Sequence, residues 1–219
     1  MSIRFPPEAI IFDLDGTLVD TAADIVAALD ALLGEYGRSA VGEAAGRSMI
    51  GDGARVLIER GFAATGGPVA DMDAAQKRWF EIYSADIARH SKPYPGVVET
   101  LAKLRSGGIA LGVCTNKADA PTHLLLESLD LKRYFTAVVG GDVAHRKPDP
   151  RHLFATVGAL GSAPDRALMV GDSPNDAKAA HAARIRLILV DYGYSNEPVH
   201  RLGADTVLSD FAGLLEIVA

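Results

Sequence analysis

Five short, mainly apolar runs dominate the hydrophobic pattern of this 219-residue sequence. They are Ala9–Phe12, Ile109–Cys114, Ala137–Val139, Ala167–Val170 and Ile185–Val190. Continuous rather than alternating runs are typical of strands that are buried on both faces of a parallel sheet. Helical patterns such as Val97–Arg105, before the second run, and Arg151–Leu160, between the third and fourth, separate the runs. The sequence therefore predicts an α/β fold with a doubly wound, Rossmann-like parallel sheet.

One long interval has no strand-like run and predicts an inserted group of helices. Three helical patterns occupy it, and we expect the second to end near Gly61. We predict two domains: an α/β core of residues 1–19 and 93–219, and a small α-helical cap of residues 20–92. An aromatic pair at helical spacing, Trp79 and Tyr83, is interpreted as part of the cap core rather than as a binding site.

Two aspartates follow the first predicted strand. Asp13 and Asp15 are residues i and i+2, so their side chains leave the strand on the same face. The carboxyl ends of parallel strands are where α/β folds bind their ligands. Adjacent carboxylates repel each other and need a cation or a shared proton. Taken alone, this pair could also be an acidic turn that ends the strand.

The other central strands also end in polar residues. Thr115 and Asn116 follow the second run, and Lys147 follows the third, where neighbouring prolines fix the backbone. Asp172 and Asp176 follow the fourth run at the start of a helix. Each signal alone has a plain structural explanation, as a helix cap or a surface side chain. Together, at one edge of a sheet, they predict a site for an anion and for a cation with oxygen ligands.

In order along the chain, these segments resemble the four motifs of the haloacid dehalogenase superfamily of phosphatases. The segments are Asp13–Asp20, Thr115–Asn116, Lys147–Pro150 and Gly171–Asp176. The resemblance covers essentially the whole chain, since helices inserted after the first motif correspond to the small cap of that superfamily. It implies a phosphatase that acts on a small-molecule phosphomonoester.

The resemblance implies a role for each motif residue. Asp13 would attack phosphorus and form an aspartyl-phosphate. Asp15 would protonate the leaving alcohol and then take a proton from the hydrolytic water. Lys147 would neutralise negative charge on Asp13 and on the phosphate, while Thr115 and Asn116 would bind phosphoryl oxygens.

The same resemblance implies Mg²⁺ as the cofactor. The Asp13 carboxylate, the backbone carbonyl of Asp15 and the Asp172 carboxylate would hold the ion. Asp176 would support these ligands from nearby.

Two further stretches, Met49–Gly61 and Asp191–Pro198, resemble the phosphoglycolate phosphatase subfamily. This likeness implies hydrolysis of 2-phosphoglycolate to glycolate and phosphate. The sheet motifs bind only the phosphoryl group and the metal, which all substrates share. We therefore expect the cap to determine which leaving group is accepted. We expect Arg55, which follows the glycine loop Gly51–Gly53, to pair with the substrate carboxylate. A solvated position on the helix is the alternative for Arg55.

Other functions on this fold stay open. They are a phosphatase for another small sugar or nucleotide phosphate, and a β-phosphoglucomutase-like phosphosugar mutase. A non-catalytic binding protein is disfavoured because no motif residue is missing. Asp15 argues against a dehalogenase, which does not need a second aspartate. A phosphonate hydrolase of the superfamily uses a cap lysine and lacks the second acid. Lys77 is the only lysine between Asp20 and His90, and Asp15 is present, so this function is disfavoured.

Composition limits the partners and the location. The net charge is -6 without a run of basic residues, so we expect no nucleic-acid partner. No segment reaches the roughly 20 apolar residues of a membrane span, and the N-terminus has no apolar stretch of signal-peptide length. The single cysteine, Cys114, excludes an intramolecular disulfide and favours a reducing compartment. We expect a cytoplasmic monomer or homodimer.

Overall fold

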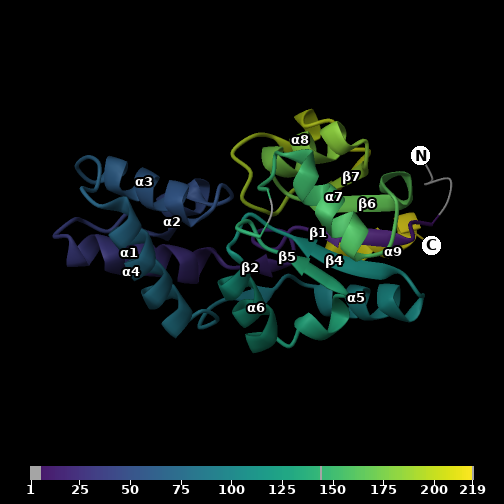
Figure 1. The fold of residues 1–219 in the computed structure, drawn as a ribbon, viewed down its shortest axis with the longest axis horizontal. Coiled ribbons are helices and arrows are strands. Elements are labelled where there is room, and N and C mark those ends of the chain that lie inside the picture. Colours follow the sequence, from purple (N-terminus) through teal and green to yellow (C-terminus); the bar gives the residue numbers. More distant parts are fainter. Residues whose placement is uncertain (1–5, 144, 219) are drawn as a thin grey trace.

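A six-stranded parallel sheet forms the centre of the molecule in the computed structural model, which describes residues 6–143 and 145–218 (Figure 1). The strand order is β5-β4-β1-β6-β7-β8, and every neighbouring pair is parallel. The predicted α/β fold is confirmed, and each predicted run forms a strand with nearly the expected bounds. The strands are β1 (Ala9–Phe12), β4 (Ala110–Cys114), β5 (Ala137–Val139), β6 (Ala167–Gly171), β7 (Arg186–Val190) and β8 (Thr206–Leu208).

Helices cover both faces of this sheet. In Figure 1, α7 and α8 lie above the sheet, and α5 and α6 lie below it. Short 3₁₀ turns complete the connections at Lys132–Tyr134, Pro164–Arg166, Val199–Arg201 and Phe211–Gly213. The helices are α5 (Val97–Ser106), α6 (Asp119–Ser128), α7 (Pro150–Ala159), α8 (Pro174–Ala183) and α9 (Leu214–Val218).

Burial on both faces explains why the strands are continuous apolar runs. Ile10 and Phe12 of β1 belong to a hydrophobic cluster that includes residues of α5, whereas Ala9 and Ile11 belong to a second cluster that includes residues of α7. All four side chains are fully buried. Because successive strand residues point to opposite faces, a strand between two helical layers has no position for a polar side chain.

A group of helices lies between the two-residue strands β2 (Val19–Asp20) and β3 (Lys92–Pro93), at the left of Figure 1. We call this segment, residues 21–91, the cap helices. The interval that was predicted to form a helical cap is therefore helical, and the division into two domains at residues 20 and 92 stays a prediction. Residues 1–5 and 219 of the predicted core lie outside the described residues. The elements are α1 (Ala22–Glu35), α2 (Glu43–Gly46), a 3₁₀ turn (Arg47–Met49), α3 (Ala54–Ala64) and α4 (Met72–Ala85).

The expected end of the second cap helix near Gly61 is wrong. Helix α3 continues to Ala64, and Gly61 lies inside it. A Cβ atom at Gly61 would lie 2.8 Å from Cδ1 of Leu29 on α1. The glycine therefore marks the close approach of two packed helices, where a larger side chain would push them apart.

The chain leaves the core and returns to it at one place. Strands β2 and β3 pair antiparallel, with Val19 opposite Pro93. The Asp24 carboxylate on α1 accepts hydrogen bonds from the backbone N–H groups of His90 and Ser91, at 2.7–3.0 Å. This side chain thus ties the first cap helix to the segment that leads back into the sheet.

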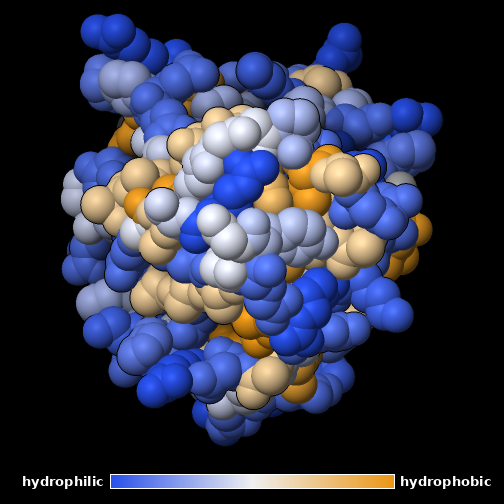
Figure 2. All heavy atoms as spheres, turned by 90° about the vertical axis from the view of Figure 1, so that its left-hand side faces the viewer, coloured by the Kyte–Doolittle hydropathy of each residue, from blue (hydrophilic) through white to orange (hydrophobic). Residues whose placement is uncertain are grey.

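The surface on the side of the cap helices is mainly hydrophilic, and its apolar atoms form separate patches (Figure 2). Within the described residues, no helix is both long enough and apolar enough to cross a membrane.

Candidate active site

The four predicted motifs meet at the carboxyl edge of the sheet. Asp13 follows β1, Thr115 follows β4 and Asp172 follows β6, and β1 lies between β4 and β6. The backbone N–H of Asp13 donates to the carbonyl of Val170 at 2.9 Å, which fixes the position of Asp13 relative to β6. Lys147 reaches the same place from the segment after β5. The structure brings these residues together, and the roles assigned to them stay predictions.

Lys147 is an ammonium group held between carboxylates. Its Nζ lies 2.9 Å from Oδ1 of Asp13 and 2.6 Å from Oδ1 of Asp176, and its side chain is 1% exposed. Burial alone would lower the pKa of Lys147, but the charges of Asp13 and Asp176 raise the pKa above its usual value. The lysine therefore stays charged and supplies a fixed positive charge beside Asp13.

Three carboxylates gather beside this lysine. One oxygen from each of Asp13, Asp172 and Asp176 lies within 4.8 Å of the others. Burial raises the pKa of Asp13 to about 6, although Lys147 opposes the shift. Burial, with the charges of Asp176 and Asp13, raises the pKa of Asp172 well above its usual value. The cluster holds more negative charge than one lysine balances, so its electrostatics favour a bound cation.

The surroundings of Asp172 hold its carboxylate in one position. Oδ1 accepts a hydrogen bond from Thr17 Oγ1 at 3.1 Å, and Oδ2 accepts one from the backbone N–H of Tyr194 at 2.6 Å. A Cβ atom at Gly16 or Gly193 would lie 2.5 or 2.3 Å from Oδ2. Two glycines thus leave just enough space for this oxygen. Fixed carboxylate oxygens fit a hard divalent cation such as Mg²⁺.

Both oxygens of Asp176 already have partners. Oδ1 contacts Lys147, and Oδ2 accepts hydrogen bonds from the backbone N–H groups of Asp172 and Ser173 and from Ser173 Oγ. Ser173 and Asp176 also form a capping box at the start of α8. Asp176 therefore organises the loop and the lysine around the cluster, in keeping with its predicted supporting position.

Asp15 lies beside a second buried lysine. Nζ of Lys117 is 3.1 Å from both carboxylate oxygens of Asp15, and Thr21 Oγ1 donates to Oδ1 at 2.8 Å. Nζ of Lys117 also lies 4.6 Å from the ring centroid of Tyr83. Lys117 was not predicted as a site residue, although it directly follows Thr115 and Asn116 at the end of β4. Its position at the carboxyl end of a central strand was the sequence signal that could have identified it as a site residue.

Thr115 and Asn116 are both buried at this edge. Thr115 Oγ1 accepts a hydrogen bond from the backbone N–H of Lys117 at 3.2 Å. Nδ2 of Asn116 donates to the carbonyls of Gly51 and Lys147, at 3.0 and 2.9 Å. Oδ1 of Asn116 is buried and has no hydrogen-bond partner among the described residues. The Asn116 amide therefore connects Gly51 of the cap segment with Lys147, beside the predicted phosphate position.

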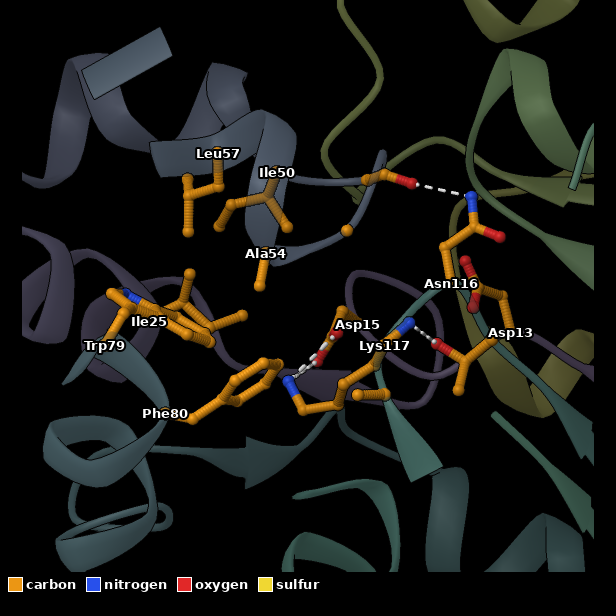
Figure 3. A pocket seen from close by; sticks show the side chains of 14 residues that line it. Asp13, Asp15, Ile25, Ile50, Ala54, Leu57, Trp79, Phe80, Asn116 and Lys117 are labelled. Atoms are coloured by element: carbon orange, nitrogen blue, oxygen red, sulfur yellow. Dashed lines mark hydrogen bonds and ion pairs between the residues drawn. The ribbon is translucent and has the colours of Figure 1, made fainter. Parts of the chain in front are cut away.

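Two cavities adjoin Asp13 and Asp15. The first has a volume of about 40 Å³ and lies between the sheet edge and the cap helices. The second, of about 220 Å³, is more polar and extends past Asp172 and Arg60. Figure 3 shows the first cavity, with Asp15 and Lys117 between its polar and apolar sides. The apolar wall consists of Ile25, Ile50, Leu57, Trp79 and Phe80. The buried Trp79, predicted as cap core, thus also lines the cavity.

Arg55 lies away from both cavities. Its Nη1 is 2.6 Å from Oδ1 of Asp73, its Nε is 3.7 Å from Oε1 of Glu59, and its side chain is 44% exposed. The expected contact between Arg55 and a substrate carboxylate has no support in this arrangement. The side chain is turned toward acidic partners on the surface of the cap helices, as in the solvated alternative.

Tyr194 is a site residue for which the sequence predicted no role. In addition to the backbone contact with Asp172, its hydroxyl accepts hydrogen bonds from the N–H groups of Thr21 and Ala22 and donates one to Asp20 Oδ1. Tyr194 thus connects the predicted metal site with the start of α1. Tyr194 lies in the stretch Asp191–Pro198 that carries the subfamily resemblance, and the glycine before it was a local sign of a close approach.

A doubly wound sheet with buried aspartates and lysines at its carboxyl edge, covered by inserted helices, defines an α/β enzyme whose site suits a cation and an anionic group. The family model described as haloacid dehalogenase-like hydrolase matches residues 10–190, and the chain belongs to this family. The predicted superfamily is therefore confirmed.

The chain is also similar to named proteins and to solved structures. The chain is 47% identical over 208 residues to the phosphoglycolate phosphatase of Caulobacter vibrioides, covering 92% of this chain and 86% of that protein. The crystal structure of a predicted phosphoglycolate phosphatase from Haemophilus somnus 129pt matches with a TM-score of 0.93 and 30% identity, covering 99% of both chains. A mutant of CbbY from Rhodobacter sphaeroides in complex with xylulose-(1,5)bisphosphate matches with a TM-score of 0.81 and 26% identity, covering 95% of this chain and 96% of that one.

Proposed function

We propose that the protein is a magnesium-dependent phosphomonoester hydrolase that cleaves 2-phosphoglycolate through an aspartyl-phosphate on Asp13. The placement of Asp13 is the observation that carries this proposal. It lies 2.9 Å from Lys147, shares a cluster with Asp172 and Asp176, and lines both cavities. The proposal keeps the cytoplasmic location and the monomeric or homodimeric state predicted from the sequence.

The contacts of Asp13 suit a nucleophile. Oδ1 accepts a hydrogen bond from the backbone N–H of Leu14 at 2.8 Å and contacts Lys147, whereas Oδ2 accepts none from the described residues. An oxygen of Asp13 forms a bond to phosphorus while the bond from phosphorus to the leaving oxygen breaks. Lys147 compensates the negative charge that would otherwise keep the carboxylate and the phosphate apart.

Asp13, the backbone carbonyl of Asp15 and Asp172 would hold Mg²⁺, with Asp176 in support. When bound, the ion would supply positive charge that stabilises the negative charge on the phosphoryl group. The fixed carboxylate of Asp172 and the excess negative charge of the cluster support this assignment.

Asp15 is placed to move protons at the leaving oxygen. Thr21 and Lys117 fix its carboxylate from two directions. In the first step Asp15 donates a proton to the departing alkoxide, and in the second it accepts a proton from the water that attacks the aspartyl-phosphate. The second step releases inorganic phosphate and restores Asp13.

The size of the cavity between the sheet edge and the cap helices favours a small leaving group. A volume of about 40 Å³ on this side leaves room for only a small group, whereas the second cavity of about 220 Å³, also beside Asp13 and Asp15, is the larger space. The name of the Caulobacter relative agrees with this choice. The bisphosphate in the CbbY complex is the observation that favours the alternative, a sugar phosphate as substrate.

A hydrolysis panel tests the proposal. The purified enzyme is given 2-phosphoglycolate, sugar phosphates and nucleoside monophosphates, in Mg²⁺ or in excess chelator, and released phosphate is measured. We expect the highest kcat/KM for 2-phosphoglycolate and no turnover in chelator. Full activity in chelator would contradict the metal requirement. Conversion of a sugar 1-phosphate to the 6-phosphate as the main reaction would instead assign a mutase.

A further inference from the structure

Lys117 has an unusual position for a lysine. It is 8% exposed and extends from the end of β4 to Asp15, along the border between the polar and apolar sides of the cavity of about 40 Å³ (Figure 3). Both carboxylate oxygens of Asp15 lie 3.1 Å from Nζ and balance the charge of this buried ammonium group. Lys117 therefore brings a positive charge into this cavity.

The position of Asp15 determines what Lys117 can touch. The leaving oxygen must come within hydrogen-bond distance of an Asp15 oxygen to receive its proton, and both Asp15 oxygens lie 3.1 Å from Nζ of Lys117. The first atoms attached to the leaving oxygen therefore lie beside Nζ. An ammonium group has three N–H donors, and the two contacts to Asp15 use at most two of them.

Lys117 supplies the positive charge on this side of the site, whereas Arg60 and Lys178 line the second cavity. Among the described residues that line this cavity, Lys117 is the only positively charged one, and much of the remaining wall is apolar. A carboxylate in such a cavity loses its water and gains no other charged partner, so its pairing with Lys117 is stronger than in solvent. Arg55, the residue expected from the sequence, lies elsewhere with Asp73.

We propose that Lys117 determines specificity by binding the carboxylate of the leaving group, an inference that rests on the proposed phosphatase function. In 2-phosphoglycolate the carboxylate is attached to the carbon next to the leaving oxygen. One lysine can therefore contact both Asp15 and the substrate carboxylate. The preference for an acidic leaving group comes from the core strand β4, and the cap helices contribute the apolar wall that excludes larger groups.

Two substrates of similar size test this inference. We compare kcat/KM for 2-phosphoglycolate with that for 2-hydroxyethyl phosphate, in which a hydroxymethyl group replaces the carboxylate. In Lys117→Met the ratio of the two values should fall about ten- to a hundredfold, because a charged hydrogen bond is lost for one substrate only. The loss of the Lys117 contact with Asp15 affects both substrates and cancels in the ratio, as does any loss of folded protein.

Three further variants complete the experiment. Lys103→Met removes an exposed lysine of α5 and should leave the ratio unchanged. Lys117→Arg keeps the charge and should retain more of the preference than Lys117→Met. Arg55→Met tests the rival residue, and we expect it to leave the ratio unchanged.

Each result against the inference has a distinct meaning. Equal losses on both substrates in Lys117→Met would overturn it and leave Lys117 as a residue that acts through Asp15 alone. A changed ratio in Arg55→Met, without one in Lys117→Met, would overturn it in favour of Arg55. Equal wild-type activity on both substrates would overturn the inference while the phosphatase function stands. No phosphate release from any ester by the wild type with Mg²⁺ would overturn both.

Discussion

Asp13 is the residue on which the proposed reaction depends most directly. Asp13→Asn keeps the size of the side chain but removes the nucleophilic charge and a predicted metal ligand. We expect kcat to fall by about a thousandfold or more. The fold should persist, because replacing a carboxylate that is buried beside two others relieves repulsion. Steady-state phosphate release measures the fall in kcat, and circular dichroism shows whether the fold persists.

Asp149→Ala is the control for this change. Asp149 caps α7, where its carboxylate accepts a hydrogen bond from the backbone N–H of Arg151 at 2.9 Å. Its loss should remove one helix cap, lower stability slightly and leave activity nearly unchanged. Activity of Asp13→Asn within about tenfold of the wild type would exclude the covalent mechanism.

His152 gives a prediction about pH. Its side chain is fully buried, with Nε2 3.2 Å from the carbonyl of Val139, and burial, with the charge of Lys147, lowers its pKa to about 4. Between about pH 6.5 and pH 4 the unfolded chain therefore binds a proton that the folded protein does not, so stability falls as the pH falls through this range. Above pH 6.5 the residue is neutral in both states and has no such effect.

Urea unfolding at pH 7 and pH 5 measures this effect. The wild type should lose about 2 kcal/mol between these values that His152→Gln, which cannot take up the proton, retains. The glutamine keeps an N–H group for the Val139 carbonyl. Equal pH dependence of the two proteins would show that His152 does not titrate in this way.

The residues of the site were predictable to different degrees. Asp13, Asp15 and Asp172 follow apolar runs directly, so local pattern places them at one sheet edge. The direction of Arg55 was not predictable, because it depends on how α3 is rotated about its axis. Ala54 lines the cavity, and the next helical residue points about 100° away from it.

At the scale of elements, the loop after β7 (residues 191–198) controls the predicted metal site without contributing a ligand to it. A Cβ atom at Gly193 would lie 2.4 Å from Cβ of Asp172, a contact that no rotation of the carboxylate relieves. Gly193→Ala should therefore displace Asp172. We expect the Mg²⁺ concentration for half-maximal activity to rise about ten- to a hundredfold.

Gly158→Ala is the matched control for this substitution. Gly158 lies in α7, and a Cβ atom there would meet nothing within 4 Å. It should raise stability by about 0.5–1 kcal/mol and leave the Mg²⁺ dependence unchanged. An unchanged Mg²⁺ requirement in Gly193→Ala would mean that Asp172 is not a ligand, or that residues 191–198 shift to make room for the added methyl group.

The elements themselves were predictable where burial gives a strong local pattern. The five predicted strands read as apolar runs, and the four between the edge strands β5 and β8 are buried on both faces. The missed elements are short, since β2 and β3 have two residues each, β8 has three and α2 has four. Pairings of this length depend on contacts between distant segments, such as Val19 with Pro93, which local sequence does not display.

At the scale of the whole molecule, the predicted metal site links cation binding to folding. The unfolded chain does not gather Asp13, Asp172 and Asp176, so Mg²⁺ should bind the folded protein preferentially and stabilise it. At a Mg²⁺ concentration about a hundredfold above Kd the gain is about 2.7 kcal/mol, which raises Tm by about 5–10 °C for a chain of this length.

Thermal unfolding with and without Mg²⁺ tests this linkage. In Asp172→Asn the shift should largely disappear. Potassium chloride at equal ionic strength separates specific binding from general screening. The same rise of Tm in Asp172→Asn, or in potassium chloride alone, would contradict a metal site at these three residues.

The position of the cap helices over the sheet edge was the least predictable part of the molecule. It depends on a hydrophobic cluster that is continuous from Phe12 of β1 through Leu18 to Ile25 and Trp79 of the cap helices. These residues are far apart in the chain, and their apolar character alone does not specify which of them meet. The sequence therefore predicts a helical insertion but not which wall each helix forms.

The pairing of β2 with β3 has a consequence for the evolution of the protein. The ends of the inserted segment are neighbours, so the distance between them does not depend on how many residues lie between. A lineage can lengthen, shorten or exchange residues 21–91 without altering the register of β1 with β4 and β6. Selectivity toward larger or smaller esters can then diverge among descendants while the site residues that follow β1, β4 and β6 are inherited unchanged.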